Sequence, residues 1–131
     1  MENKQNDRRY ILGCLAALLL LVVIDQCTKV LAVQKLKDQD AIVWIPGVFE
    51  LLYLENRGAA FGIFENMRWM FLVGTGLIIV LTIFLFRRFP KKRKYIPLLV
   101  SLTMIAAGGI GNLIDRLRLG YVIDFFYVSL I

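Results

Sequence analysis

The stretch YIPLLVSLTMIAAGGIGNLI, residues 95–114, is an uncharged run followed at once by Asp115 and Arg116. It is about as long as the ~20 residues that an α-helix needs to cross a bilayer, so it predicts a spanning helix. After Gly120, a further carboxylate, Asp124, lies inside renewed apolar sequence. Ionisable groups at membrane depth are costly, so Asp115, Arg116 and Asp124 are candidates for function.

The composition indicates an integral membrane protein. Of the 131 residues, 59% are hydrophobic, above the usual ~45–50% of globular domains. The chain has no histidine, which excludes Ser-His and Cys-His hydrolase sites and removes the commonest zinc ligand. We expect neither a metal nor another cofactor. Six of the sixteen basic residues lie in the loop 87–94. A basic loop between two apolar runs indicates the cytoplasmic side of a membrane, not a nucleic-acid partner.

Two further apolar runs, about 10–33 and 69–86, predict two more spanning helices. Together with the helix at about 95–114 they give an all-α, helical-bundle membrane protein, a single domain over residues 1–131. The segment 34–66 is expected on the extracytoplasmic side. Its turn signal at Pro46-Gly47 and the apolar residues after it predict a small β element on the membrane surface.

Polar residues gather at the outer end of the third predicted helix. Gly108, Gly111, Asn112 and Asp115 are spaced i, i+3, i+4, i+7 and therefore share one helix face. Asp25 and Lys29 form an i, i+4 pair near the outer end of the first helix. Both groups of polar residues are therefore expected near the outer ends of their helices.

These carboxylates allow two interpretations. The structural one is a helix-end ion pair of Asp115 with Arg116 or Arg118, with Asp124 buried and hydrogen-bonded. The functional one is a pair of carboxylates that share a proton and hydrolyse a bond, since closely spaced like charges cannot both ionise. Composition alone suggests Asp115 with Asp124, or either of them with Asp25.

Four blocks of sequence, in order, resemble the lipoprotein signal peptidases (type II, or prolipoprotein, signal peptidases) of bacteria. They are Asp25-Gln26-Cys27-Thr28-Lys29, Asn56-Arg57-Gly58-Ala59-Ala60-Phe61-Gly62, Gly108 through Arg116, and Val122-Ile123-Asp124-Phe125. The resemblance covers nearly the whole chain. It implies a four-helix aspartic endopeptidase of the bacterial cytoplasmic (plasma) membrane. Both termini would be cytoplasmic, and a β-cradle and the active site would lie at the extracytoplasmic face.

The resemblance also implies the reaction and its partners. Such an enzyme removes the signal peptide from diacylglyceryl-modified prolipoproteins by cutting just before the lipidated cysteine. The expected partners are these prolipoproteins and membrane lipid, with the enzyme acting as a monomer. Asp124 matches one catalytic aspartate of the family. The residues expected to hold substrate or site geometry are Asp25, Lys29, Asn56, Gly58, Gly108, Asn112, Asp115 and Arg116.

The sequence departs from the family pattern in one respect. The second catalytic aspartate of the family lies in a Phe-Asn-x-Ala-Asp motif that opens the fourth helix, and this sequence ends at Ile131, before such a motif. We therefore expect a form truncated before the fourth helix, and expect it to be inactive alone. Two other functions remain open: a non-catalytic lipoprotein-binding protein, or a small transporter component that uses Asp25, Asp115 and Asp124 as a proton path.

Overall fold

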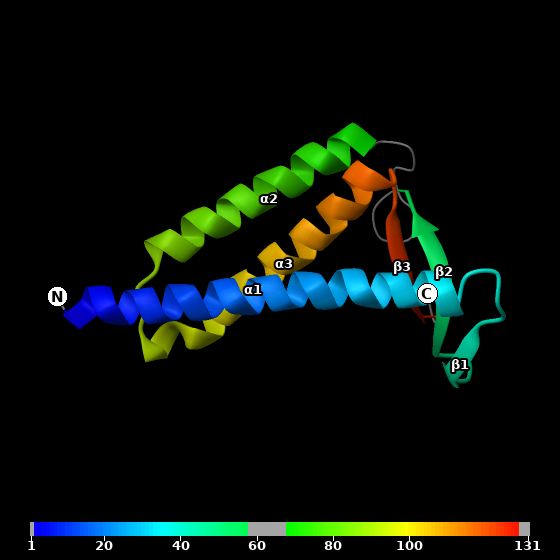
Figure 1. Cartoon of the computed structure of the whole chain (residues 1–131), viewed down its shortest axis with the longest axis horizontal. Helices are drawn as coiled ribbons and strands as arrows, with labels where there is room; N and C mark the ends of the chain where they lie inside the picture. Colours follow the sequence, from blue (N-terminus) through cyan, green and yellow to red (C-terminus); the bar gives the residue numbers. More distant parts are fainter. Residues whose placement is uncertain (1, 58–67, 129–131) are drawn as a thin grey trace.

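The computed structural model describes residues 2–57 and 68–128. Three long helices and a small sheet make up these residues, as Figure 1 shows. In chain order the elements are α1 (Glu2–Lys35), β1 (Ile42–Ile45), β2 (Phe49–Asn56), α2 (Arg68–Arg88), the short 3₁₀ helix η2 (Arg93–Tyr95), α3 (Ile96–Arg118) and β3 (Val122–Val128).

All three helices are long and apolar enough to cross a membrane. The helix α3 lies between the other two and packs against both, whereas α1 and α2 diverge without packing against each other over their described residues. Pro97 occupies the first turn of α3, where its missing N–H leaves no intrahelical bond unmade. The outer faces of the helices are apolar and exposed, for example at Leu19, Leu77 and Val80. Such faces are suited to contact with lipid chains.

The sheet is antiparallel, with the order β1-β2-β3.

The first helix begins at Glu2, earlier than the apolar run suggests, and α3 continues to Arg118. The chain then reverses at Gly120, whose φ of 87° favours glycine, and enters β3. A break at Gly120 therefore separates α3 from β3. It returns Asp124 toward the bundle, with Asp124 opposite Leu54 in the β2–β3 register.

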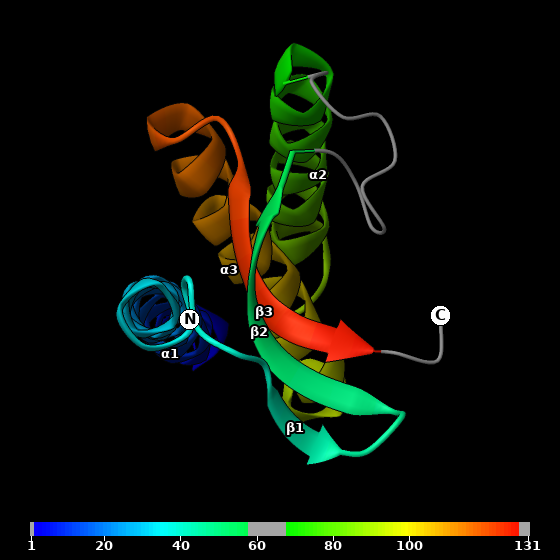
Figure 2. The same cartoon turned by 90° about the vertical axis from the view of Figure 1, so that its right-hand side faces the viewer.

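A small hydrophobic core fixes the sheet to the end of α1. Ala32 on α1 and Leu36, which directly follows this helix, pack with Ile123 on β3, and all three are buried. Figure 2 shows the end of α1 beside the curved sheet. Around this core lie half-buried apolar side chains from the sheet and the α3–β3 turn: Leu51, Tyr53, Leu119, Tyr121 and Phe125. The position of β3, and so of Asp124, is set by this packing.

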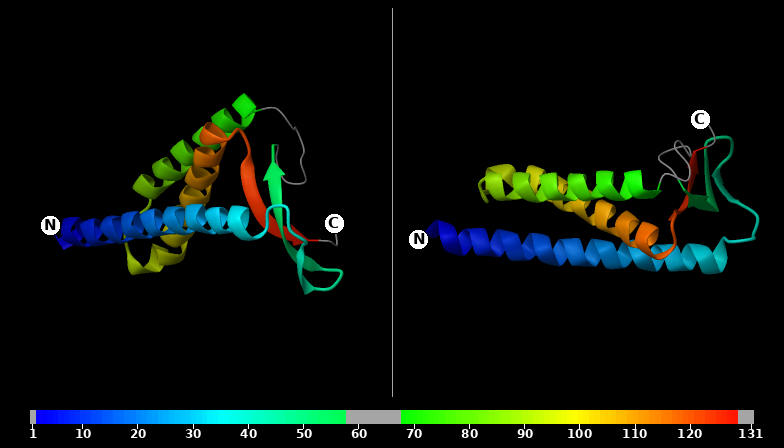
Figure 3. Two further views of the ribbon diagram at one scale, coloured as in Figure 1. Left: turned by 45° about the vertical axis from the view of Figure 1, so that its right-hand side comes forward. Right: turned by 90° about the horizontal axis from the view of Figure 1, so that it is seen from above.

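The molecule has two chemically different ends. The N-terminal end of α1 and the basic residues around η2 lie at one end, and the sheet lies at the other, as both views of Figure 3 show. Since α3 runs from the basic end to the sheet, its last turn delivers Asp115 and Arg116 next to β3. The candidate site residues lie at this sheet end.

Candidate active site

Lys29 lies at the centre of a polar cluster between α1 and α3. Its side chain is 6% exposed, and its Nζ lies 2.8 Å from Oδ2 of Asp25 and 3.0 Å from Oδ2 of Asp115. The same Nζ donates a hydrogen bond to Oδ1 of Asn112 at 3.3 Å. One lysine thus joins its own helix to the polar face of α3. Because a buried charge is costly unless paired, this arrangement holds the two helices in one register.

Gln26 reinforces the same junction. Its Nε2 donates to Oδ2 of Asp25 at 3.0 Å, to the carbonyl oxygen of Gly111 at 3.2 Å and to Oδ1 of Asp115 at 3.2 Å. Sequence reasoning did not single out Gln26 as a site residue. Its position in the Asp25-to-Lys29 block, three residues before Lys29, places it on the same helix face and could have identified it.

Gly111 is the point at which α3 comes closest to the Asp25 side chain. A Cβ built on Gly111 would lie 2.8 Å from Cγ of Asp25 and closer still to its Oδ2, separations that Cβ atoms do not adopt. In contrast, a Cβ at Gly108 would meet nothing within 4 Å. Of the two glycines on the predicted face, the structure brings Gly111 into the polar cluster and leaves Gly108 outside it.

Asp115 is fully buried and saturated with donors. Besides Lys29 and Gln26, it accepts a hydrogen bond from the backbone N–H of Ile123, with 3.0 Å from N to Oδ2. This bond ties the end of α3 to the start of β3. Two side-chain donors and one backbone donor thus occupy this carboxylate. Its surroundings are those of a structural carboxylate, and its main ion pair is with Lys29, not with a neighbouring arginine as the structural interpretation had it.

Asp124 has different surroundings. It is half-buried on β3, and the one hydrogen bond to its carboxylate among the described contacts comes from Asn56, with 3.4 Å from Nδ2 to Oδ2. Burial raises the pKa of the Asp124 carboxyl, and so does the negative charge of Asp115. The hydrogen bond from Asn56 and the positive charges of Lys29 and Arg116 oppose that rise in pKa. Asp124 thus has fewer described donors than Asp115, and burial favours its protonated form.

Arg116 links the two groups. Its side chain is buried, its guanidinium lies 4.6 Å from the ring centroid of Phe71 on α2, and its charge interacts with both Asp124 and Asp115. An arginine over an aromatic face is held in place by a cation–π contact. Arg116 therefore supplies positive charge that acts on both Asp115 and Asp124.

The structure thus divides the predicted residues into two adjoining groups. Asp25, Lys29, Asn112 and Asp115 form the buried polar cluster, while Asn56 and Asp124 lie together on the sheet. Gly58 lies outside the described residues. Among residues 2–57 and 68–128, no group of three or more His, Cys, Asp or Glu side chains could hold a metal ion. Both cysteines, Cys14 and Cys27, are free.

Comparison with known proteins gives consistent matches along the chain. The family described as signal peptidase (SPase) II matches residues 17–131. The lipoprotein signal peptidase of Streptococcus thermophilus is 42% identical over 115 residues, which are 88% of this chain and 74% of that protein. The lipoprotein signal peptidase of Halothermothrix orenii is 41% identical over 107 residues, 82% of this chain and 72% of that protein.

Solved structures agree with the sequence matches. A bacterial membrane enzyme determined by the in meso method at 2.3 Å resolution superposes with a TM-score of 0.74 at 27% identity, over 88% of this chain and 70% of that one. A second, determined by the same method at 1.9 Å, gives a TM-score of 0.70 at 25% identity, over 90% and 75%. These matches favour a peptidase over the lipoprotein-binding and transporter alternatives. The chain belongs to the signal peptidase II family, the lipoprotein signal peptidases of bacterial membranes.

Proposed function

We propose that this chain forms part of an aspartic endopeptidase site, with Asp124 as one of its two catalytic carboxylates. The observation that carries the proposal is the contrast between two neighbouring aspartates. Asp115 is fully buried and accepts three donors, whereas Asp124 is half-buried and bonded to Asn56. A general acid or base must exchange a proton, which a saturated carboxylate cannot do readily.

The substrates we propose are diacylglyceryl-modified prolipoproteins, cut just before the lipidated cysteine. The name that the curated relatives carry supports this substrate class. An active site at the sheet end suits it, because the lipid of the substrate could remain in the bilayer while its peptide reaches Asp124. Exposed apolar side chains on β1, such as Trp44 at 66% exposure, would lie at the membrane surface there.

The chemistry requires a second carboxylate. One carboxyl of the pair would protonate the scissile carbonyl oxygen while the other takes a proton from the attacking water; the amine then leaves with a proton returned to it. We propose that a segment following Ile131 in the complete enzyme supplies this partner, so that the 131 residues alone do not cleave. Asp25, Lys29, Asn112 and Asp115 would fix the scaffold, and Arg116 and Asn56 would orient Asp124. The expected roles of Gly58 and Gly108 in holding substrate or site geometry remain predictions. Gly108 lies on the exposed side of α3.

We further propose a multi-pass topology with the active site outside the cytoplasm. The basic residues at 87–94 favour the cytoplasmic side for their end of the bundle. The sheet, whose strand β3 carries Asp124, lies at the opposite end (Figure 3). A peptidase with this orientation would meet its substrates after their export. The enzyme is proposed to act as a monomer.

The experiment is a gel-shift assay of a purified diacylglyceryl prolipoprotein. The 131-residue chain is compared with the same chain extended by the sequence that follows the matched region in the Streptococcus thermophilus relative. We expect the extended chain to cleave the prolipoprotein and the 131-residue chain not to cleave it. In the extended chain, Asp124→Asn should abolish cleavage, while Asp40→Asn, an exposed aspartate before β1, should retain it. Cleavage by the Asp124→Asn variant would remove Asp124 from the mechanism.

A further inference from the structure

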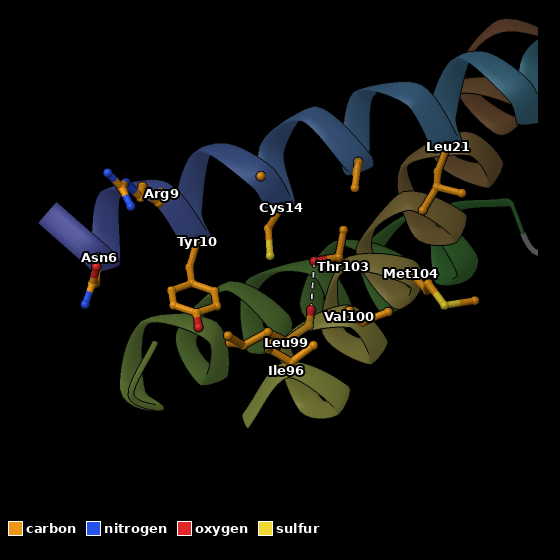
Figure 4. A pocket seen from close by; sticks show the side chains of 12 residues that line it. Asn6, Arg9, Tyr10, Cys14, Leu21, Ile96, Leu99, Val100, Thr103 and Met104 are labelled. Carbon is orange, nitrogen blue, oxygen red and sulfur yellow. Dashed lines mark hydrogen bonds between the residues drawn. The ribbon is translucent and has the colours of Figure 1, made fainter. Parts of the chain in front are cut away.

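Three adjoining cavities lie at the basic end of the bundle, remote from Asp124. The first, here the α1–α3 groove, has a volume of about 530 Å³ and lies between Tyr10, Gly13 and Cys14 of α1 and Leu99 and Thr103 of α3. In Figure 4, Tyr10 and Cys14 project from α1 toward Leu99 and Thr103. Apart from Asn6 and Arg9 at its mouth, the lining of this groove is largely apolar.

The second cavity, here the α1–α2 groove, occupies the space where those two helices diverge. Its volume is about 460 Å³, and it lies between Ile11, Leu15 and Leu18 of α1 and Ile83 and Phe86 of α2. The two grooves run on either side of Cys14 and Thr103, which line both. Each has a volume within the roughly 300–1,000 Å³ typical of small-ligand sites.

The third cavity is polar and basic, and it joins both grooves. This basic bowl has a volume of about 530 Å³. It shares Asn6 and Tyr10 with the α1–α3 groove, and Arg87 and Lys91 with the α1–α2 groove. A basic cavity thus adjoins two apolar grooves. That shape matches an amphipathic molecule with one headgroup and two hydrocarbon chains.

The charge of the basic bowl is not neutralised within the described part of the chain. The one carboxylate in its lining is Asp7, against five basic residues. Lys91 donates to the backbone carbonyls of Phe86 and Phe89, so it caps the end of α2. None of the ion pairs formed by residues 2–57 and 68–128 involves the other four basic residues, which are Arg87, Arg88, Lys92 and Arg93.

We propose that these three cavities form a binding site for an anionic diacyl phospholipid. The phosphate would lie in the basic bowl, and one acyl chain would occupy each groove. Basic pockets between transmembrane helices at the cytoplasmic side are suited to anionic headgroups, and lipids of that leaflet are the nearest source. A second copy of the chain would place like charges against the bowl, and an apolar helix would leave its charge uncompensated.

The headgroup is tested by native mass spectrometry of the 131-residue chain released from detergent with added dioleoyl phosphatidylglycerol or dioleoyl phosphatidylcholine. We expect at least about tenfold tighter retention of phosphatidylglycerol, and loss of that preference in the double variant Arg88→Gln/Lys92→Gln. The matched control, Lys35→Gln/Arg118→Gln, removes the same amount of positive charge at the sheet end. This variant should keep the preference for phosphatidylglycerol. Equal retention of the two lipids, or an equal effect of both double variants, would overturn the proposal.

The grooves are tested by filling one of them. Gly13 lines the α1–α3 groove, and a Cβ at this position meets nothing within 4 Å, so Gly13→Leu directs a side chain into the groove. We expect at least about tenfold weaker retention of phosphatidylglycerol, with the same result for Ala17→Leu in that groove. Gly74→Leu on α2, also free of contacts, is the control. Unchanged retention in both groove variants, or a dimer in place of the lipid adduct, would contradict the proposal.

Discussion

At the scale of single residues, Lys29 is the one cation in contact with both Asp25 and Asp115 among the described residues. Lys29→Met would keep the aliphatic bulk of the side chain but leave two carboxylates together without that cation. Breaking a buried ion pair in this way costs about 3–5 kcal/mol. We expect a large drop in the thermal midpoint in detergent, measured by circular dichroism. Lys35→Met, exposed on the same helix, is the control. An equal effect of both variants would show that the cluster contributes little to stability.

The surroundings of Asp124 predict an unusual pH dependence of stability. Because burial raises the pKa of the folded-state carboxyl above its unfolded value, the folded protein binds this proton more tightly. The stability contributed by Asp124 is therefore present at low pH and is lost as pH rises through the folded pKa. Asp124→Asn replaces the titrating carboxyl with a neutral amide, so the variant does not lose this stability as pH rises. The variant should be more stable than the parent near pH 8, with the difference shrinking toward pH 4.

That difference is measured as the shift in the thermal midpoint across a pH series. Asp40→Asn, which alters an exposed carboxylate, should show no such trend. A destabilised Asp124→Asn variant at pH 8 would mean that the hydrogen bond from Asn56 and the nearby positive charges outweigh burial.

At the scale of helices and strands, the contact between α1 and α3 depends on Gly111. Gly111→Ala would press a methyl group against the Asp25 carboxylate, since the space beside Gly111 is too small for a Cβ. Crowding of this kind costs about 1–3 kcal/mol. Gly108→Ala, one turn away with open space, should be neutral or stabilising by up to about 1 kcal/mol from helix propensity. Thermal unfolding compares the two variants; equal midpoints would contradict the close approach.

The helices could be predicted from sequence and much of the sheet could not. Long uncharged runs predict spanning helices because the bilayer selects for length and apolarity. The strand β3 reads as a short apolar run without alternation, which periodicity alone cannot distinguish from a helix segment. This strand pairs with β2, for example with Val122 opposite Asn56, and the pairing joins residues that are far apart in sequence. The contrast between Asp115 and Asp124 also depends on tertiary contacts, because Lys29 and Gln26 approach Asp115 from another helix.

At the scale of the whole molecule, the separation of the basic end from the sheet end predicts the membrane orientation. In a background with Cys14 and Cys27 replaced by alanine, Asp40→Cys should react with a membrane-impermeant thiol reagent added to intact cells. Lys92→Cys should react only after the cells are opened, because positively charged loops are retained in the cytoplasm. Both positions are exposed. The reverse labelling pattern would invert the topology and place Asp124 inside the cell.

We expect Asp124 to carry out the chemistry while Asp115 holds the scaffold. The most direct measurement is prolipoprotein cleavage per folded molecule by the extended chain carrying either Asp124→Asn or Asp115→Asn, with the folded fraction taken from thermal unfolding. We expect Asp124→Asn to remain folded and to lose all cleavage. Asp115→Asn should lower the thermal midpoint strongly and retain cleavage in the molecules that remain folded. Full stability with no cleavage for Asp115→Asn, and continued cleavage for Asp124→Asn, would show that the two aspartates have the opposite roles.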